Sequence, residues 1–353
     1  MIDTATAAKP RAIDPVGDLN QHIRSRPRRI NPAAMLLLPS FLIVSMFVYG
    51  FIAYTVGVSV SKNWKPVKPN FALNDPWYKS YRDLGKVPRF QADVRNSIVF
   101  AVIFLFVAVS AGLVLALLVH RMIRSRPFFR SLFLLPYSLS FIVTGVVWRW
   151  LFNPVSGVNL LLKNSGVSGA YERLTGRPLQ PDWVSSPTVA GDISGLLERM
   201  IPGGKYIQVK MGIPLALVAV VIAAAWQLMG FAMAMFLAGL GSIPEEVHEA
   251  AMIDGASGFR YYRSIAIPLL KPMAVTTIVI LTHVAFKMFD LVYAMSGSGV
   301  GFATDMPGMY VYETMYKALR PNAGSAAAIV MLALVCVVVV PYLVRRGKEN
   351  AGE

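Results

Sequence analysis

The chain has 353 residues, of which 55% are hydrophobic and 15% are Asp, Glu, Lys or Arg. Soluble domains average about 25% charged residues, and the mean hydropathy of this chain is +0.54. The apolar residues form runs that are too long for the core helices of a soluble domain. The composition therefore excludes an ordinary soluble protein and predicts a polytopic membrane protein.

The net charge of +15 arises from 34 Lys and Arg residues against 19 Asp and Glu residues. Such an excess is also typical of proteins that bind nucleic acid. In a membrane protein, however, basic residues gather at the cytoplasmic ends of the spans. We therefore expect membrane lipid, and no nucleic acid, around this chain. The single cysteine, Cys336, lies in an apolar run, so no intramolecular disulfide can form.

Residues 1–32 are polar and basic, and they contain neither the apolar core nor the cleavage site of a signal peptide. Four arginines lie just before the first apolar run, at Arg24, Arg26, Arg28 and Arg29. We expect this segment to be a cytoplasmic basic tail.

A helix needs about 20 apolar residues to cross the hydrocarbon core of a bilayer. Six stretches meet this requirement, at 33–60, 97–119, 128–152, 212–240, 272–296 and 324–344. Helices are expected because lipid offers no partners for unpaired backbone groups. Pro39, Pro136 and Pro214 fall inside these stretches and predict kinks. The predicted fold is an all-α membrane protein with six transmembrane helices over 33–344, followed by a cytoplasmic tail at 345–353.

The orientation follows from the basic residues near the span ends. The total of Lys and Arg is the same on the two sides, but short loops and span ends carry most weight. The segment from His120 to Arg130 holds four basic residues and no acidic residue, and Arg345 and Arg346 follow the last span. Both termini are therefore expected in the cytoplasm.

Two long loops are then extracytoplasmic. The first, 61–96, contains four prolines and several Trp and Tyr residues, which predict an ordered but irregular loop. The second, 153–211, is an insert rich in Gly, Pro and Ser, with one amphipathic stretch from Ile193 to Ile201.

The cytoplasmic loop at 241–271 has the signals of a short helix. Ser242 and Glu245 have the spacing of a capping box, and Pro244 fits a first turn. Gly255 predicts the end of the helix, because glycine readily adopts the left-handed conformation found there. The resulting helix of about three turns is too polar to span a membrane.

This helix allows two interpretations. Glu245, Glu246 and Glu249 place negative charge near the positive end of its dipole, and the small side chains of Ala250 and Ala251 let another protein approach closely. The helix either transmits a movement of a soluble partner protein to the membrane spans or merely packs on its own domain.

The loop resembles the signature of ABC importer permeases. Glu249-Ala250-Ala251 is followed after three residues by Gly255, and after nine more by Ile265, Ala266 and Ile267-Pro268. The family has Leu where this chain has Ile267. In the family this segment is the coupling helix, which docks in a groove of the ATP-binding subunit. The resemblance implies a coupling role for Glu245, Glu246, Glu249, Ala250, Ala251, Asp254, Gly255, Gly258, Phe259 and Pro268.

The resemblance extends over about 33–344. The segments Arg130 to Pro136, Trp148 to Phe152, Gly157 to Asn159 and Phe286 to Met295 are similar to sugar permeases of the maltose and glycerol-phosphate group. The sequence from Gly301 to Tyr312 is similar to that of permeases for glucose or α-glucosides.

The resemblance implies one permease of an ATP-driven importer in a bacterial or archaeal cytoplasmic (inner) membrane. The implied partners are a second, paralogous permease, two ATP-binding subunits and an extracytoplasmic sugar-binding protein. A mono- or oligosaccharide, with glucose or an α-glucoside favoured, would move inward by alternating access. Glycerol-3-phosphate or another polyol is the alternative substrate.

The chain lacks the signs of a catalytic subunit. Its Gly-Lys pairs, Gly85-Lys86, Gly204-Lys205 and Gly347-Lys348, are never followed by the Ser or Thr of a Walker A motif. It also shows no Cys/His cluster or carboxylate pair. We expect no catalytic residue, cofactor or metal site here, and we expect partner subunits to bind ATP and Mg²⁺.

Ionisable residues within spans often mark substrate pathways. Lys287 and Asp290 lie three residues apart and His283 lies one turn earlier, so a helix would place them on one face. They predict either a structural ion pair or a polar face that contacts substrate. Arg149, between Trp148 and Trp150, is interpreted as an anchor in an aromatic belt.

Aromatic rings suit sugars because they stack on the C–H faces. Tyr137, Trp226, Gln227 and Tyr293 are therefore pathway candidates, although ordinary helix packing explains each one alone. A secondary transporter would use Lys287 and Asp290 as an ion-coupling pair, but no inverted repeat is evident. A membrane enzyme acting on lipid-linked sugars would need an acidic cluster, which the sequence lacks.

Overall fold

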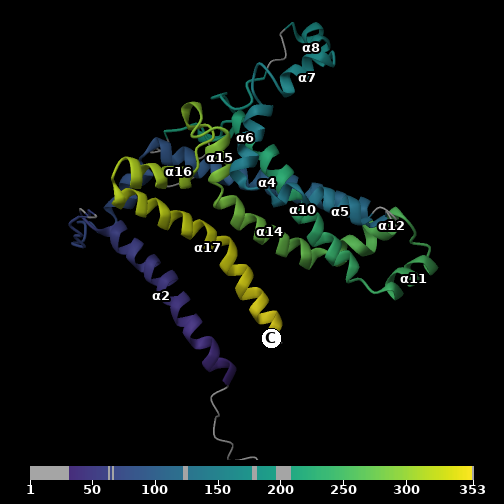
Figure 1. Ribbon diagram of the computed structural model, residues 1–353, viewed down its shortest axis with the longest axis horizontal. Helices are drawn as coiled ribbons and strands as arrows, with labels where there is room; N and C mark the ends of the chain where they lie inside the picture. The colour runs from purple at the N-terminus through teal and green to yellow at the C-terminus, as the bar shows by residue number, and fades with distance from the viewer. Residues whose placement is uncertain are drawn as a thin grey trace, which may run out of the picture. The chain divides into compact units, whose positions relative to one another are not determined.

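The computed structural model describes residues 32–351, apart from 63, 66, 122–125, 177–180 and 196–207. The predicted basic tail therefore lies almost wholly outside the described residues, as does the end of the predicted amphipathic stretch. The described chain is mostly helical (Figure 1). It forms two compact units that divide after Tyr54.

Helix α2 (Pro32–Val60) makes up the described part of the first unit and continues into the second. Its residues are apolar on every side, which is the pattern of a helix that spans a membrane. Pro39 lies inside the helix without ending it.

The second unit is built from helices and short helical turns. Its longer helices are α4 (Pro88–Arg121), α6 (Phe141–Leu151), α10 (Leu215–Gly241), α14 (Lys271–Phe286) and α17 (Pro321–Ala351). The shorter ones are α3 (Lys79–Gly85), α5 (Arg126–Leu134), α7 (Val158–Asn164), α8 (Val167–Thr175), α11 (Glu245–Ile253), α12 (Phe259–Tyr261), α13 (Ile267–Leu269), α15 (Asp290–Met295) and α16 (Pro307–Tyr312). The 3-10 turns are η1 (Pro136–Ser138) and η4 (Val300–Phe302), and the π-helical turns are η3 (Tyr262–Ala266) and η5 (Glu313–Lys317). Two short strands, β1 (Val189–Ala190) and β2 (Ile213–Pro214), pair antiparallel.

Within the described residues, four helices are long and apolar enough to cross a membrane: α2, α4, α10 and α17. Two bent pairs raise the number to six if each pair counts as one span. One pair joins α5 and η1 to α6 with a bend of 95°, and the other joins the segment Phe259–Leu269 to α14 with a bend of 62°. The helical membrane fold is therefore as predicted, with four to six spans.

The predicted kink at Pro136 is instead a break in the helix. Helix α5 ends at Leu134, and Pro136 begins the 3-10 turn that precedes α6. Proline lacks an N–H and its ring clashes with the preceding turn, so the ladder of helical hydrogen bonds is interrupted. The Gln227 side-chain amide donates to the Leu139 carbonyl at 2.7 Å and so satisfies one group that the break frees.

Other predicted boundaries also differ from the structure. The stretch predicted at 272–296 is broken, because α14 ends at Phe286 and α15 begins at Asp290. Helix α4 begins earlier than expected, at Pro88, because its polar first turns are invisible to a hydropathy criterion. Helix α17 continues through most of the predicted tail, and Pro214 lies in β2, just before α10.

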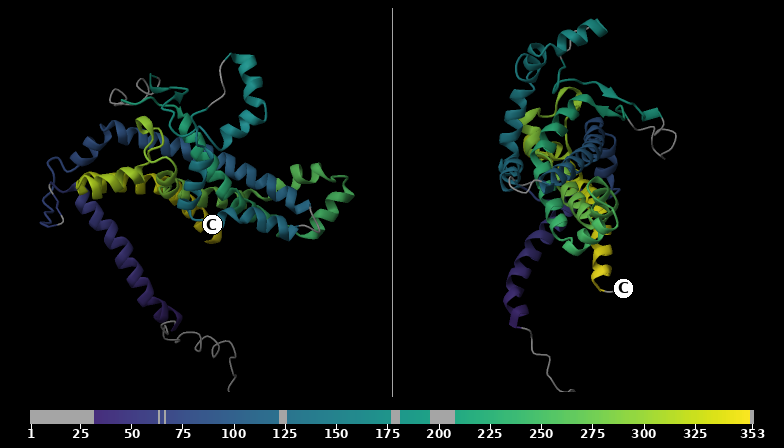
Figure 2. Two further views of the ribbon diagram at one scale, coloured as in Figure 1. Left: turned by 45° about the horizontal axis from the view of Figure 1, so that its top comes forward. Right: turned by 90° about the vertical axis from the view of Figure 1, so that its right-hand side faces the viewer.

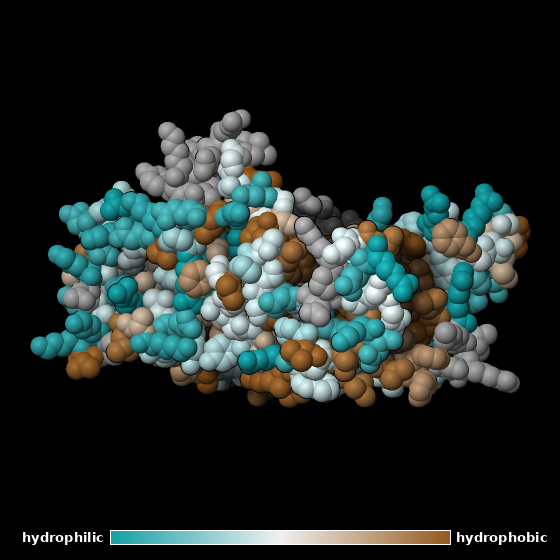
Figure 3. All heavy atoms as spheres, turned by 90° about the horizontal axis from the view of Figure 1, so that it is seen from above, coloured by the Kyte–Doolittle hydropathy of each residue, from teal (hydrophilic) through white to brown (hydrophobic). Residues whose placement is uncertain are grey.

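The two predicted extracytoplasmic loops also contain regular structure. Helix α3 and the first turns of α4 occupy the end of the loop expected at 61–96, so it is only partly irregular. In the insert, α7 and α8 lie together, away from the other helices of the second unit (Figures 1 and 2). The face seen in Figure 3 is covered in large part by hydrophilic side chains, most densely at the left of the view.

The core of the second unit forms where α4 packs along α10 (Figure 2). Ala108, Gly112 and Ala116 recur at every fourth position of α4, so small residues line one face. A Cβ atom added at Gly112 would lie 2.5 Å from the Cβ of Ala232 and 2.9 Å from the Met233 nitrogen. Such close approach through small residues is how helices associate in membranes, where water provides no driving force.

We predict that Gly112→Val lowers the free energy of unfolding by about 3 kcal/mol, because the added atoms meet the backbone of α10 rather than a flexible side chain. The thermal midpoint of the purified protein in detergent measures the effect. Gly169→Val in α8 is the control, because nothing lies within 4 Å of a Cβ atom added at Gly169. Equal midpoints for the two variants would contradict the role of Gly112.

Candidate functional site

A hollow of about 240 Å³ lies where the two broken stretches meet. Phe141, the first residue of α6, lines one part of it, and residues between His283 and Asp290 line the rest. Backbone outside a helix is tolerated at membrane depth only where protein buries it or where it borders a water-filled cavity. We call this space the central hollow.

Helices α6 and α15 pack closely beside the central hollow. A Cβ atom added at Gly145 would lie 2.6 Å from the Leu291 carbonyl oxygen and 2.8 Å from the Cβ of Ala294. Because this contact requires the absence of a side chain, the two helices that follow the breaks are held together as one body.

The structure brings His283, Lys287 and Asp290 to the central hollow, but not by the expected route. The helix ends at Phe286, so Lys287 and Asp290 do not share one helical face. All three side chains are exposed, and no ion pair joins Lys287 to Asp290. All three border the central hollow, which favours a polar wall over a structural ion pair.

The remaining pathway candidates lie elsewhere. Tyr137 is half exposed and stacks on Phe231 with 5.5 Å between ring centroids. Trp226 packs edge-on against Trp148 at 5.7 Å, and the buried Gln227 holds the break between α5 and α6. Trp226 and Gln227 therefore fasten α6 to α10 rather than lining the central hollow.

A second hollow, of about 710 Å³, adjoins the chain that follows α15. We call it the loop hollow. Arg149 and Tyr293 line it together with Asp182 and Ser185 of the insert. Of the two tryptophans beside Arg149, Trp148 packs against the core, whereas Trp150 is exposed as an aromatic belt would require.

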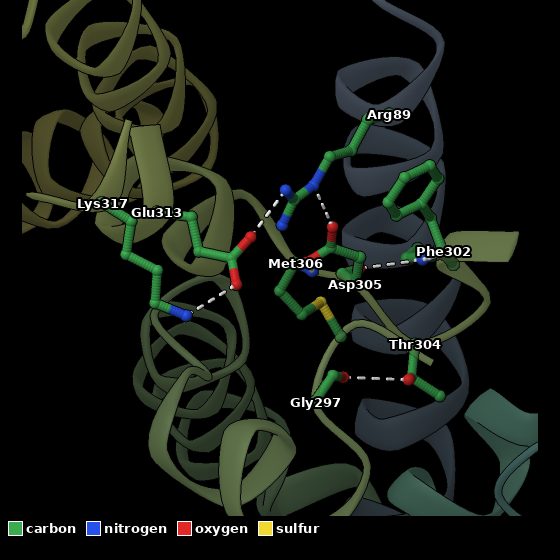
Figure 4. A network of polar contacts seen from close by, with 9 residues as sticks. Arg89, Gly297, Phe302, Thr304, Asp305, Met306, Glu313 and Lys317 are labelled. Carbon is green, nitrogen blue, oxygen red and sulfur yellow. Dashed lines mark hydrogen bonds and ion pairs between the residues drawn. The ribbon is translucent and has the colours of Figure 1, made fainter. Parts of the chain in front are cut away.

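The chain that borders the loop hollow continues to Asp305, where ion pairs anchor it (Figure 4). The Arg89 Nε atom lies 2.6 Å from a carboxylate oxygen of Asp305, whose side chain is wholly buried. A second Arg89 nitrogen lies 2.7 Å from Glu313, which also pairs with Lys317 at 3.2 Å. We call these four residues the Arg89 network.

Further hydrogen bonds fix the loop that ends at Asp305. The Asn96 side-chain amide donates to the carbonyl oxygens of Phe302 and Asp305, each at 2.8 Å. The Thr304 hydroxyl donates to the Gly297 carbonyl at 3.1 Å (Figure 4). Burial raises the pKa of the Asp305 carboxyl, and the bond from Arg89 opposes that rise.

We predict that Arg89→Gln lowers the free energy of unfolding by roughly 3 kcal/mol at pH 7, because it leaves the buried Asp305 carboxylate without its cation. The deficit shrinks as the pH falls. A carboxyl whose pKa is raised in the folded state binds its proton more tightly there than in the unfolded chain, so acid favours folding.

Thermal midpoints of the detergent-purified variants across a pH series measure this effect. Arg82→Gln is the matched control, because Arg82 and its partner Asp83 are half exposed and 3.7 Å apart, and such pairs contribute little. A deficit for Arg89→Gln that grows as the pH falls would contradict the prediction.

Helix α11 begins later than the sequence predicts. Pro244 precedes its first residue, Glu245, and the Ser242 hydroxyl donates to the Gly239 carbonyl at 2.8 Å instead of capping the helix. Ser242 therefore belongs to the end of α10, and the predicted capping box is wrong.

The predicted stop at Gly255 is confirmed. Gly255 has φ +73°, its N–H donates to Met252 at 3.1 Å, and the Ala256 N–H donates to Ala251 at 2.8 Å. These two bonds form a Schellman motif, which requires the left-handed conformation at this position.

Helix α11 has one buried side and one exposed side. Ala251 is buried and His248 packs edge-on against Tyr261 at 4.6 Å, so the helix does pack on its own unit. The other proposed coupling residues are exposed: Glu245, Glu246, Glu249, Ala250, Asp254, Gly255, Gly258, Phe259 and Pro268. Met252 and Ile253 add exposed apolar surface beside them.

Residues 108–346 match the family model described as the inner membrane component of binding-protein-dependent transport systems. The chain belongs to this family. It is a permease of the ABC importer type and thus an integral component of the inner membrane.

Two relatives illustrate the range of this permease family. The chain is 30% identical to the xylose/arabinose import permease of Haloferax volcanii over 88% of this chain and 86% of that protein. It is 25% identical to the trehalose/maltose transport system permease of Thermococcus litoralis over 92% and 97% of the two chains. The fold resembles a crystal structure of a bacterial ABC transporter involved in alginate import, with a TM-score of 0.65, 15% identity and coverage of 94% and 98%.

The family match covers the central hollow and α11 of the permease but begins after Arg89. The Arg89 network therefore joins a part of α4 outside the match to residues inside it. The hydropathy pattern does not indicate the ion pair between Arg89 and Asp305, since the two residues are 216 residues apart in the sequence. The sequence shows only that charged residues precede an apolar run.

Proposed function

We propose that this permease moves a mono- or oligosaccharide into the cell through the central hollow. The hollow itself carries the proposal: two interrupted helices face each other there and expose His283, Lys287 and Asp290 between aromatic walls. Transporters commonly bind substrate where membrane helices are interrupted. The relatives that import xylose, arabinose, trehalose or maltose support a sugar, and the Gly301 to Tyr312 resemblance favours glucose or an α-glucoside.

Energy is proposed to enter through α11. Its exposed acidic and apolar side would dock on an ATP-binding subunit, which would bind ATP and Mg²⁺ and carry the ATPase activity. From α11 the chain runs through the Gly255 turn into α12, α13 and α14, and α14 ends at the central hollow. A displacement of α11 would therefore reach the hollow along consecutive helices.

The proposed assembly contains this chain, a second paralogous permease, two ATP-binding subunits and an extracytoplasmic sugar-binding protein. Both termini of this chain would lie in the cytoplasm, which places α11 on the same side as the ATP-binding subunits. The basic segment from His120 to Arg130 supports that orientation.

Two alternatives make different predictions. Glycerol-3-phosphate or another polyol would use the same hollow, and direct uptake assays separate it from sugars. An ion-coupled secondary transporter would need Lys287 and Asp290 as a coupling pair, and the absence of an ion pair between them disfavours it.

The test is purification of the tagged chain from its native membrane in a gentle detergent, followed by mass spectrometry of the proteins that accompany it. We expect an ATP-binding subunit and a second permease. Uptake of radiolabelled glucose, maltose, trehalose, xylose and glycerol-3-phosphate by cells with and without the permease then identifies the substrate. Isolation of the chain alone after cross-linking, with uptake that survives ATP depletion, would overturn the proposal.

A further inference from the structure

Four aromatic rings from two separate segments lie in contact. Phe289 and Tyr293 have centroids 5.4 Å apart, and Tyr312 lies 5.8 Å from Phe289 and 6.0 Å from Tyr293. Tyr316 lies 5.8 Å from Tyr312. We call these four residues the aromatic ladder.

The aromatic ladder is open along its length rather than buried. The exposed fractions are 46% for Tyr293, 37% for Tyr312 and 70% for Tyr316. Burial in the core therefore does not explain the stacking of the three tyrosines. Each of the three tyrosines therefore leaves part of its surface free for another molecule.

The aromatic ladder connects the two hollows. Phe289 lines the central hollow, and Tyr293 lines the loop hollow. Tyr312 touches both of these rings and Tyr316 extends the series. Aromatic residues that anchor a protein at the membrane interface are not expected to line a hollow at each end of their row. The position of the ladder between the two hollows therefore distinguishes it from membrane anchors.

The Arg89 network holds the ladder in place. The Lys317 ammonium lies over the Tyr312 ring, 5.5 Å from its centroid. Lys317 is paired with Glu313, which Arg89 fixes in turn (Figure 4). Tyr312 immediately precedes the π-helical turn η5 and Tyr316 lies within it, and such turns are frequent at functional sites.

We propose that the aromatic ladder is a binding track for the carbohydrate between the loop hollow and the central hollow. This inference rests on the proposed function. Tyrosine rings stack on the apolar C–H faces of a sugar ring, and their hydroxyl groups exchange hydrogen bonds with the sugar hydroxyls. A row of such contacts suits transport, because several weak sites let a ligand enter and leave again.

The experiment measures uptake by the complete importer with Tyr312→Leu, Tyr316→Leu or Tyr312→Phe in this permease. The probe is whichever of radiolabelled glucose, maltose, trehalose and xylose the wild-type importer takes up. We expect each Leu variant to raise the KM for uptake about five-fold, as the loss of one ring contact predicts. Tyr312→Phe retains the ring and is expected to raise the KM less.

Tyr171→Leu is the matched control, because Tyr171 is 40% exposed on α8 and lies outside the ladder. It is expected to keep the wild-type KM. Recovery of the second permease with each tagged variant tests whether the tyrosines form the contact between subunits. An unchanged KM in both Leu variants, or loss of the second permease from them, would overturn the proposal that the aromatic ladder binds carbohydrate. Failure of the wild-type importer to take up any of the four sugars would overturn the proposed function instead.

Discussion

Gly255→Asp is expected to reduce transport at least about tenfold while the permease reaches the membrane at its normal level. A residue other than glycine at φ +73° is strained by about 1 kcal/mol. A carboxylate at the end of α11 adds an unfavourable interaction with the helix dipole of up to about 1 kcal/mol. Together they oppose the Schellman turn that joins α11 to α12, and with it the proposed docking of α11 on the ATP-binding subunit.

Gly176→Asp is the matched control for this substitution. Gly176 also ends a helix in the left-handed conformation, with φ +68°. At both positions nothing lies within 4 Å of an added Cβ atom, so the strain and the added charge are equal. Transport, membrane level and recovery of the ATP-binding subunit are measured for both variants.

Glu249→Lys provides a second substitution on the same exposed side, and it reverses the charge without straining the backbone. We expect it to lose transport and the ATP-binding subunit as Gly255→Asp does. Wild-type uptake in both α11 variants at normal membrane levels would show that this helix merely packs on its own unit.

Lys287→Met and Asp290→Asn are each expected to raise the KM for uptake about tenfold, because both side chains border the central hollow. Unpaired ionisable groups at membrane depth persist where they face water or substrate. Lys271→Met is the control, because Lys271 is exposed at the start of α14, the end away from the central hollow.

Exchange of the two charges separates the two interpretations of this pair. If Lys287 and Asp290 contact the substrate, the double variant Lys287→Asp/Asp290→Lys is expected to be at least as impaired as either single variant. A structural ion pair would instead survive the exchange. Recovery of wild-type KM in the double variant would therefore contradict a substrate-contacting role.

The sequence was sufficient for the class of fold and for the end of α11. Long apolar runs leave a chain no alternative to helices in lipid, and the ladder of hydrogen bonds within each helix is local. The end of α11 was equally predictable, because the left-handed turn at Gly255 depends on that residue alone. The start of the helix was not, since Ser242 bonds backward to α10.

The candidate site was predicted in part, and for a different reason from the one the structure reveals. Helical spacing placed His283, Lys287 and Asp290 on one face, whereas a break in the helix brings them to one hollow. Tyr312 and Tyr316 carry no signal in the sequence that marks them off from other tyrosines. The contacts of Tyr312 with Phe289 and Tyr293 exist only in the folded chain, because they join segments about 20 residues apart.

Two prolines show that the local sequence does not determine whether a helix breaks. Pro39 and Pro136 both lie in apolar runs, yet α2 continues through the first and the helix breaks at the second. Beside Pro136, Gln227 of another helix bonds the Leu139 carbonyl and stabilises the broken backbone. Composition and periodicity determined that this chain forms membrane helices and a polar helix α11. Contacts between distant segments decided where the helices break, which side chains face the hollows and how Arg89 reaches Asp305, because those free energies come from partners that no local pattern records.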